Sequence, residues 1–157
     1  MPEDLQLIEG SLQALKRLSQ SYLLFIISNQ PSYAKGKTSL ENLKMVHNKL
    51  ISCFEQEEIP IREAFYCFHH PKGIGGNCEC RKPSPYFINQ AIEKYDIDKQ
   101  RSIMIGDRDT DLLCAQNAGI LFIGILPDHP ITEKNQKVSQ IGIPSLIHLE
   151  KEIKNAI

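Results

Sequence analysis

Apolar and polar positions follow two different periods along this chain. Over Glu9–Gln20 the leucines recur at the spacing of one helix face. The segment that follows, Tyr22–Ser28, is a continuous apolar run of strand length, which is typical of a buried strand. Helical and strand-like segments then alternate to the end of the chain. We therefore predict helices over Glu9–Gln20, Thr38–Gln56, Tyr86–Tyr95, Thr110–Ala118 and Pro144–Ile153, and strands over Tyr22–Ser28, Glu63–Phe68, Ser102–Gly106 and Ile120–Leu126.

Several helix boundaries carry end signals of their own. Thr38 and Glu41 form a capping-box pattern at the start of the long second helix. Ser84 and Pro85 suit the cap and first turn of the third helix. Gly119 is placed as the C-terminal stop of the fourth helix.

The alternation of strands with helices predicts an α/β fold. Strands of β-branched residues that are separated by helices pair in parallel, and the helices cover both faces of the sheet. We expect a three-layer, Rossmann-like, doubly wound sheet. The sequence has no internal repeat, no low-complexity segment and no shift in composition, so we expect residues 1–157 to form a single domain.

Composition and charge narrow the class of protein. The chain has 157 residues, of which 41% are hydrophobic and 24% charged, as in ordinary globular domains. A formal net charge of −1 without a long basic run argues against nucleic-acid and membrane partners. The N-terminus "MPEDLQLIEG" lacks the basic start and apolar core of a signal peptide, and no apolar run is long enough to span a bilayer. We expect a cytoplasmic location.

The number and placement of the cysteines indicate metal binding rather than disulfides. Five is an odd number for a disulfide framework, and clustered cysteines in a reducing compartment are more often metal ligands. Cys53 and Cys114 lie in helical patterns beside apolar residues, so we interpret both as buried, inert thiols. The other three cysteines lie together in one loop.

The loop over residues 67–80 concentrates this ligand chemistry. Cys67 and His69 form one pair, and Cys78 and Cys80 form another after a glycine-containing stretch that can fold back. Three thiolates and one imidazole are a complete tetrahedral set, typical of structural zinc, whereas catalytic zinc keeps an open position. The alternative is a set of reduced cysteines without metal, which would be open to oxidation. His70 is a poorer candidate, since adjacent side chains rarely reach one ion with good geometry.

A second cluster follows the strand predicted over Ser102–Gly106. Asp107 comes directly after this strand, where open α/β sheets place their ligands, and Asp111 follows at the start of a helix. Mg²⁺ in proteins takes one or two carboxylates and keeps positions for water and phosphate oxygens, so the pair indicates a phosphate-handling site. The alternative is that these acidic residues only cap the next helix.

Two further strand ends carry residues suited to phosphate. Ser28 and Asn29 follow the first apolar run, where a hydroxyl and backbone N–H groups can hold a phosphoryl group. Arg81 and Lys82 leave the 67–80 loop just before a helix N-terminus, where they can neutralise phosphate charge. A turn cap for the first pair and a solvated basic pair for the second remain the alternatives. Their common position at the C-terminal edge of predicted strands favours one phosphate site.

The order "SNQ", "CxHHP", "CxCRKP" and "GDRxTD" resembles the haloacid dehalogenase superfamily. Within it, the chain is similar to the D,D-heptose 1,7-bisphosphate phosphatases and their histidinol-phosphate phosphatase relatives, over nearly its whole length. The resemblance implies a hydrolase of carbohydrate metabolism that removes a phosphate from a lipopolysaccharide precursor, with structural zinc and Mg²⁺ as its cofactors. It implies zinc ligation by Cys67, His69, Cys78 and Cys80, phosphate binding by Ser28 and Lys82, Mg²⁺ binding by Asp107 with Asp111 in support, and phosphate or sugar contacts from Asn29, Arg81 and Arg108.

The chain departs from this family in one respect. The family ends its first strand in an Asp-x-Asp-Gly motif that supplies the nucleophile and the general acid and base, and this sequence has no such motif. Met1 aligns past that strand, and Asp4 is not preceded by an apolar strand, so it cannot substitute. We therefore expect a truncated reading of a longer gene, or a remnant, in which the first central strand is missing and activity is low.

Three functional hypotheses follow from these residues. The first is a sugar-phosphate phosphatase of the heptose-bisphosphate type, and the second is a non-catalytic, zinc-containing phosphosugar-binding protein. A zinc-stabilised nucleic-acid module is disfavoured by the charge and by scarce aromatic residues around the loop. We expect a small-molecule sugar phosphate as the partner. The oligomeric state stays open, with a monomer favoured.

Overall fold

The structure is a computed structural model that describes residues 2–70, 72, 76–125 and 142–143. The chain divides into two compact units, Met1–Cys78 and Glu79–Ile157. Each unit contains parallel strands and helices. All strand pairings among the described residues are parallel, which confirms the predicted α/β class.

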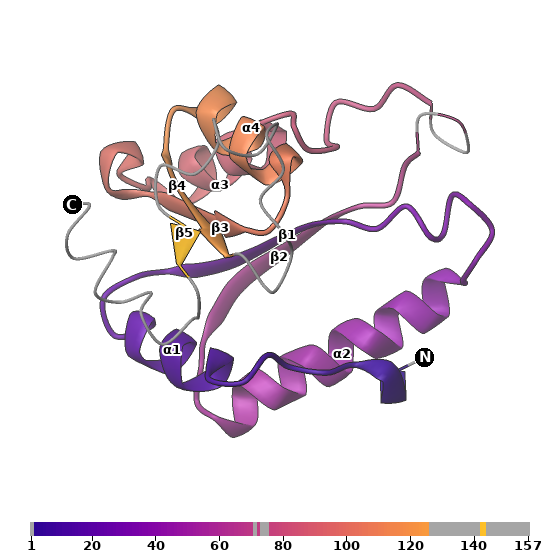
Figure 1. The fold of residues 1–157 in the computed structure, drawn as a ribbon, viewed down its shortest axis with the longest axis horizontal. Helices are drawn as coiled ribbons and strands as arrows, with labels where there is room; N and C mark the ends of the chain where they lie inside the picture. The colour runs from indigo at the N-terminus through magenta and orange to yellow at the C-terminus, as the bar shows by residue number, and fades with distance from the viewer. Residues whose placement is uncertain (1, 71, 73–75, 126–141, 144–157) are drawn as a thin grey trace. The chain divides into compact units, whose positions relative to one another are not determined.

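The first unit is built on a pair of long strands. After a short 3-10 helix, η1 (Pro2–Asp4), it contains α1 (Ser11–Leu18), β1 (Leu24–Asn29), α2 (Leu40–Gln56) and β2 (Ile61–Cys67). Strands β1 and β2 run side by side in parallel, with α1 and α2 on one side of them in the view of Figure 1. Ala14 and Leu18 of α1 and Phe54 of α2 are buried, as the apolar helix faces predict.

The start of α2 differs from the predicted capping box. Its N-cap is Ser39 rather than Thr38, and the Ser39 side chain accepts a hydrogen bond from the backbone N–H of Asn42 at 3.1 Å. Both residues carry the hydroxyl that an N-cap needs, so the sequence pattern alone does not separate them. The predicted end of the helix at Gln56 is confirmed.

The second unit contains a three-stranded parallel sheet with the order β3-β4-β5. Its elements are α3 (Tyr86–Tyr95), η2 (Lys99–Arg101), β3 (Ile103–Gly106), α4 (Asp109–Ala118), β4 (Leu121–Ile125) and β5 (Gly142–Ile143). Because β4 is the middle strand, Phe122, Ile123 and Gly124 are buried. Helix α4 packs on β3 and β4 through Leu112, Ala115 and Ala118, and Gly119 ends it with φ 69°. The predicted helices over Tyr86–Tyr95 and Thr110–Ala118 are confirmed, the second beginning one residue earlier.

Two expectations for the sheet need correction. The apolar run predicted to be a buried strand becomes β1, which is half-buried along its whole length, with Leu23 just before it 60% exposed. The reason is that β2 is the one strand hydrogen-bonded to β1 among the described residues. The described strands form two sheets, whereas one sheet was predicted. The two-residue strand β5 was not predicted. The helix predicted over Pro144–Ile153 lies outside the described residues.

In the part of the chain that the structure describes, no helix combines the length and the apolar character that a membrane crossing requires.

Candidate functional site

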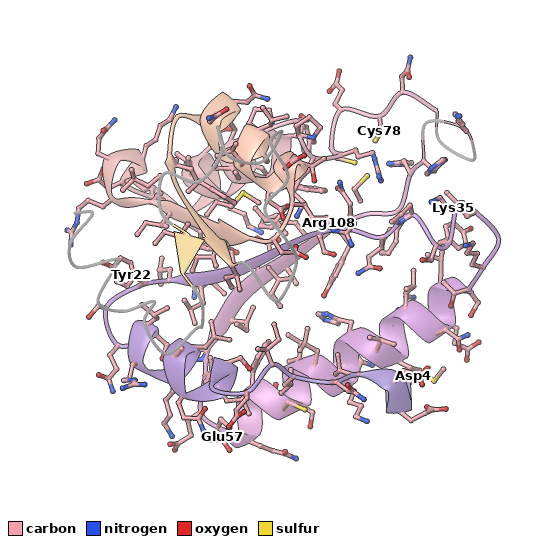
Figure 2. All side chains as sticks on the ribbon, in the orientation of Figure 1. Asp4, Tyr22, Lys35, Glu57, Cys78 and Arg108 are labelled. Carbon is pink, nitrogen blue, oxygen red and sulfur yellow. The ribbon has the colours of Figure 1, made fainter. Side chains whose placement is uncertain are left out.

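Four side chains of the 67–80 loop lie together as a possible metal site. The candidate ligand atoms of Cys67, His69, Cys78 and Cys80 all lie within 4.8 Å of one another. Cys67 is the last residue of β2 and is 0% exposed. Its Sγ lies 3.6 Å from Cys78 Sγ and 3.7 Å from His69 Nδ1. Figure 2 labels Cys78 in the loop that extends beyond β2.

The loop geometry brings these four candidate ligands together and leaves the neighbouring His70 outside the group. Gly76 has φ 42°, a left-handed conformation that a residue with a side chain adopts rarely, and its carbonyl accepts a hydrogen bond from Cys78 N–H at 3.2 Å. His70 is not part of the group, and its Nδ1 accepts a hydrogen bond from Lys72 N–H at 3.1 Å. All five cysteines are free thiols.

Ser28 and Asn29 lie at the carboxyl end of β1, as predicted. In the parallel pairing, Ser28 stands beside Tyr66 and Asn29 beside Cys67. The Ser28 hydroxyl accepts a hydrogen bond from Gln30 Nε2 at 3.0 Å, and Gln30 N–H donates to Cys67 O at 2.7 Å. Gln30 therefore fixes the hydroxyl and joins β1 to the start of the loop. Its role was not predicted, because an isolated glutamine after a strand carries no distinctive pattern.

A buried ion pair joins Lys82 to Asp111 in the second unit. Lys82 Nζ lies 2.7 Å from Asp111 Oδ1, and the two side chains are 11% and 6% exposed. The other carboxylate oxygen, Asp111 Oδ2, accepts a hydrogen bond from Arg108 N–H at 3.2 Å, as in one half of a capping box. Asp111 thus holds the predicted phosphate-binding lysine and the start of α4 at once.

The loop between β3 and α4 exposes two more predicted site residues. The side chains of Asp107 and Arg108 are 58% and 78% exposed, and Arg108 Nε lies 4.0 Å from Asp107 Oδ2. Figure 2 labels Arg108 at the beginning of α4. Solvent access is what a carboxylate needs if it is to bind a hydrated cation that arrives from outside.

Gly106 permits the close approach of Asp111. A Cβ added to Gly106 would lie 2.5 Å from Asp111 Oδ2 and 2.6 Å from Asp111 Cβ. No side chain fits at that separation. The glycine of "GD" is therefore required by packing against Asp111, a reason that is not visible in the sequence alone.

Two side chains of α4 bind the segment that follows Lys82. Cys114 Sγ donates to Ser84 O at 3.1 Å, and Asn117 Nδ2 donates to Pro83 O at 2.9 Å. Cys114 is 1% exposed, and burial raises its pKa to about 11, so it remains a protonated donor at neutral pH. The prediction that Cys114 is buried is confirmed. Cys53, for which burial was also predicted, is only half-buried in α2.

A polar aromatic pair was also missed by sequence reasoning. His47 Nδ1 of α2 lies 2.8 Å from the Tyr66 hydroxyl of β2, with the rings edge to face and their centroids 5.4 Å apart. Burial raises the pKa of Tyr66. The contact ties α2 to the strand position beside Ser28.

The predicted site residues thus fall into separate groups. In the first unit, Ser28 stands beside Tyr66 and Asn29 beside Cys67 at the carboxyl end of β1. In the second unit, Lys82 and Asp111 form the ion pair, and Asp107 and Arg108 lie on the loop that precedes α4. The four sulfur and nitrogen ligands gather in the loop between β2 and α3.

Comparison with known proteins places this arrangement in a family. Residues 79–136 match the HAD-hydrolase-like family model. The D-glycero-β-D-manno-heptose-1,7-bisphosphate 7-phosphatase of Pasteurella multocida (strain Pm70) is 32% identical over 97% of this chain and 85% of its own length. The chain belongs to the D-glycero-D-manno-heptose-1,7-bisphosphate 7-phosphatase family of HAD-like hydrolases.

Structural comparison agrees with that assignment. The crystal structure of a D,D-heptose 1,7-bisphosphate phosphatase from B. bronchiseptica, complexed with magnesium and phosphate, matches with a TM-score of 0.81 and 25% identity. The match covers 99% of this chain and 88% of that one. The chain is also similar to the histidine biosynthesis bifunctional protein HisB of Actinobacillus pleuropneumoniae (serotype 3, strain JL03), which is 32% identical over 80% of this chain and 34% of its own length.

Proposed function

We propose that this chain carries the zinc and phosphate sites of a phosphatase that acts on D-glycero-D-manno-heptose 1,7-bisphosphate. The observation that carries the proposal is the Lys82–Asp111 pair, at 2.7 Å and largely buried. A lysine held by a carboxylate is fixed in direction, as a group that stabilises a transferring phosphoryl group must be. The magnesium and phosphate named for the B. bronchiseptica protein support the same chemistry here.

The donor set in the loop supports zinc as the metal. A tetrahedral zinc ion, with Zn–S about 2.3 Å and Zn–N about 2.05 Å, sets two thiolates about 3.8 Å apart and a thiolate and an imidazole nitrogen about 3.6 Å apart. The corresponding separations from Cys67 are 3.6 Å to Cys78 and 3.7 Å to His69. With Cys80 as the fourth ligand, the coordination shell is closed, so the metal's role is structural.

The phosphate-handling roles follow from charge and position. Asp107 would bind Mg²⁺, while both oxygens of Asp111 already contact protein groups, so Asp111 supports the site by positioning Lys82. Mg²⁺ would neutralise charge on the bound phosphate. Ser28 is proposed to bind phosphate, and Asn29, Arg81 and Arg108 are proposed to contact phosphate or sugar oxygens.

Three thiolate ligands also favour a reducing compartment, so we propose that the protein functions in the cytoplasm.

Two alternatives differ from this proposal in testable ways. The sequence contains no Asp-x-Asp-Gly motif, so a phosphosugar-binding protein without turnover would use the same residues for binding alone. The similarity to HisB makes histidinol phosphate the second candidate substrate. Parallel assays with both phosphate esters separate these substrates.

The proposed phosphate site is tested by calorimetry with inorganic phosphate and Mg²⁺. We expect Lys82→Ala to weaken phosphate binding by roughly 10- to 100-fold, as loss of a charge-assisted contact does. Lys94→Ala is the matched control, because it removes the same charge from an exposed position of α3. Circular dichroism establishes that both variants fold. Equal phosphate affinity in wild-type, Lys82→Ala and Lys94→Ala proteins would refute the site.

A further inference from the structure

One face of α4 makes three successive contacts with the segment around Lys82. Asp111, Cys114 and Asn117 are spaced by three residues, which places them along one side of the helix. Asp111 binds the Lys82 ammonium group, Cys114 donates to Ser84 O and Asn117 donates to Pro83 O. All of these residues lie in the second unit.

The backbone carbonyls of Pro83 and Ser84 lie before the first hydrogen bond of helix α3. The hydrogen-bond ladder of α3 begins at Pro85, whose carbonyl accepts from Asn89 N–H at 2.9 Å. The carbonyls of Pro83 and Ser84 precede that position, so they lie before the ladder that begins at Pro85. The donors from α4 satisfy both.

These carbonyls belong to the tight turn that carries Lys82. The turn is closed by Ser84 N–H, which donates to Arg81 O at 2.9 Å, and Lys82 is its second residue. Anchoring the far side of a closed turn restricts the backbone from which the lysine side chain extends. The direction of the ammonium group is then set by its carboxylate partner and by the backbone anchor together.

We propose that Cys114 and Asn117 are positioning residues for Lys82, acting through the backbone carbonyls of Ser84 and Pro83. They touch no phosphate and act only by fixing the turn. The inference rests on the proposed function only for the role of Lys82 as a phosphate ligand. The anchoring of the turn follows from the geometry alone.

The test measures the reactivity of Lys82 with an amine-selective ester at mildly alkaline pH, followed by peptide mass spectrometry. Lys82 is largely buried and ion-paired, so its labelling in the folded protein is slow, and exposed Lys94 serves as internal reference. We expect Asn117→Asp, which removes the donor without changing shape, to raise the relative Lys82 labelling rate roughly two- to tenfold. Gln116→Glu makes the same amide-to-carboxylate change at the adjacent exposed position of α4 and should leave the rate unchanged.

Cys114 is tested by a pair of variants with opposite expectations. Cys114→Val keeps an apolar side chain of similar volume but lacks a donor, so it should also raise Lys82 labelling roughly two- to tenfold. Cys114→Ser retains a donor and should preserve the slow rate. Ala91→Gly, at a buried position of α3, reports the effect of lowered stability alone, because Ala91 is not among the anchoring residues.

Faster labelling in Asn117→Asp and Cys114→Val, but not in Gln116→Glu, Cys114→Ser or Ala91→Gly, supports the positioning role. Unchanged labelling in Asn117→Asp and Cys114→Val, or an equal rise in Ala91→Gly, overturns it. Phosphate affinity is measured separately on the same proteins. A labelling change without an affinity change would leave the anchoring intact and count against Lys82 as the phosphate ligand.

Discussion

At the scale of single residues, the second unit depends on the contact between Asp111 and the backbone at Gly106. The carboxylate that holds Lys82 lies where any side chain at position 106 would stand. The same carboxylate accepts the Arg108 N–H. A substitution at Gly106 should therefore affect the position of Lys82 indirectly, through Asp111.

Gly106→Ala should lower the free energy of unfolding by about 1–3 kcal/mol, because the new methyl group overlaps Asp111. Urea denaturation measures the loss. A double-mutant cycle identifies its cause, since the penalty of Gly106→Ala should shrink in an Asp111→Ala background, where the clashing atoms are gone. An equal penalty in both backgrounds would show that the overlap with Asp111 is not responsible.

Cys114 should make stability fall in alkaline solution. Its pKa rises on folding from 9.0 to about 11 because burial disfavours the thiolate. Between these values the unfolded chain has released a proton that the folded chain retains, so the stabilisation present below about pH 9 is lost as pH rises toward about 11. Urea titrations of wild type and Cys114→Ser across this window should show a steeper decline for wild type. Parallel declines would contradict the raised pKa.

At the scale of elements, the N-terminus of α2 offers a choice between two adjacent hydroxyls. Ser39 caps the helix, and Thr38 lies outside it. Ser39→Ala should cost about 1 kcal/mol of stability, as loss of an N-cap does. Thr38→Ala should stay within about 0.5 kcal/mol of wild type, as surface changes usually do. The reverse order in thermal or urea unfolding would restore the capping box read from the sequence.

Elements with a strong local signal could be predicted from sequence. Helix α3 and the end of α4 at Gly119 depend on nearby residues, and both were found where expected. Strand β5 is two residues long and exists through its pairing with β4, so no local pattern announces it. The half-burial of β1 likewise depends on how many strands pair with it.

The same distinction between local patterns and long-range contacts holds for the candidate site. The four ligands of the loop follow from residue type and spacing, and the structure brings them together. Two contacts join residues that are far apart in the sequence. Cys114 and Ser84 are 30 positions apart, and Asn117 and Pro83 are 34 positions apart. Such contacts require the packing of α4 to be known, so they could not be predicted.

At the scale of the whole molecule, the metal loop should contribute to folding. Freshly reduced protein should retain about one zinc ion per chain after dialysis, because three thiolates and an imidazole complete its coordination. Cys78→Ser or Cys80→Ser should lower the zinc content and the melting temperature, whereas Cys53→Ser in α2 should leave the zinc content unchanged. Elemental analysis that finds no zinc in reduced wild-type protein would refute the assignment.

The zinc and phosphate sites are proposed to serve phosphate release from a heptose bisphosphate by way of a carboxylate nucleophile. The most direct measurement is phosphate release from D-glycero-D-manno-heptose 1,7-bisphosphate by the 157-residue chain and by the same chain with a family-like segment bearing Asp-x-Asp-Gly placed before Met1. We predict turnover for the extended protein, and for the chain as given a rate lower by several orders of magnitude, on the order of 10⁴-fold or more. Robust turnover by the unextended chain that survives extensive purification would show that the Asp-x-Asp-Gly segment is not required.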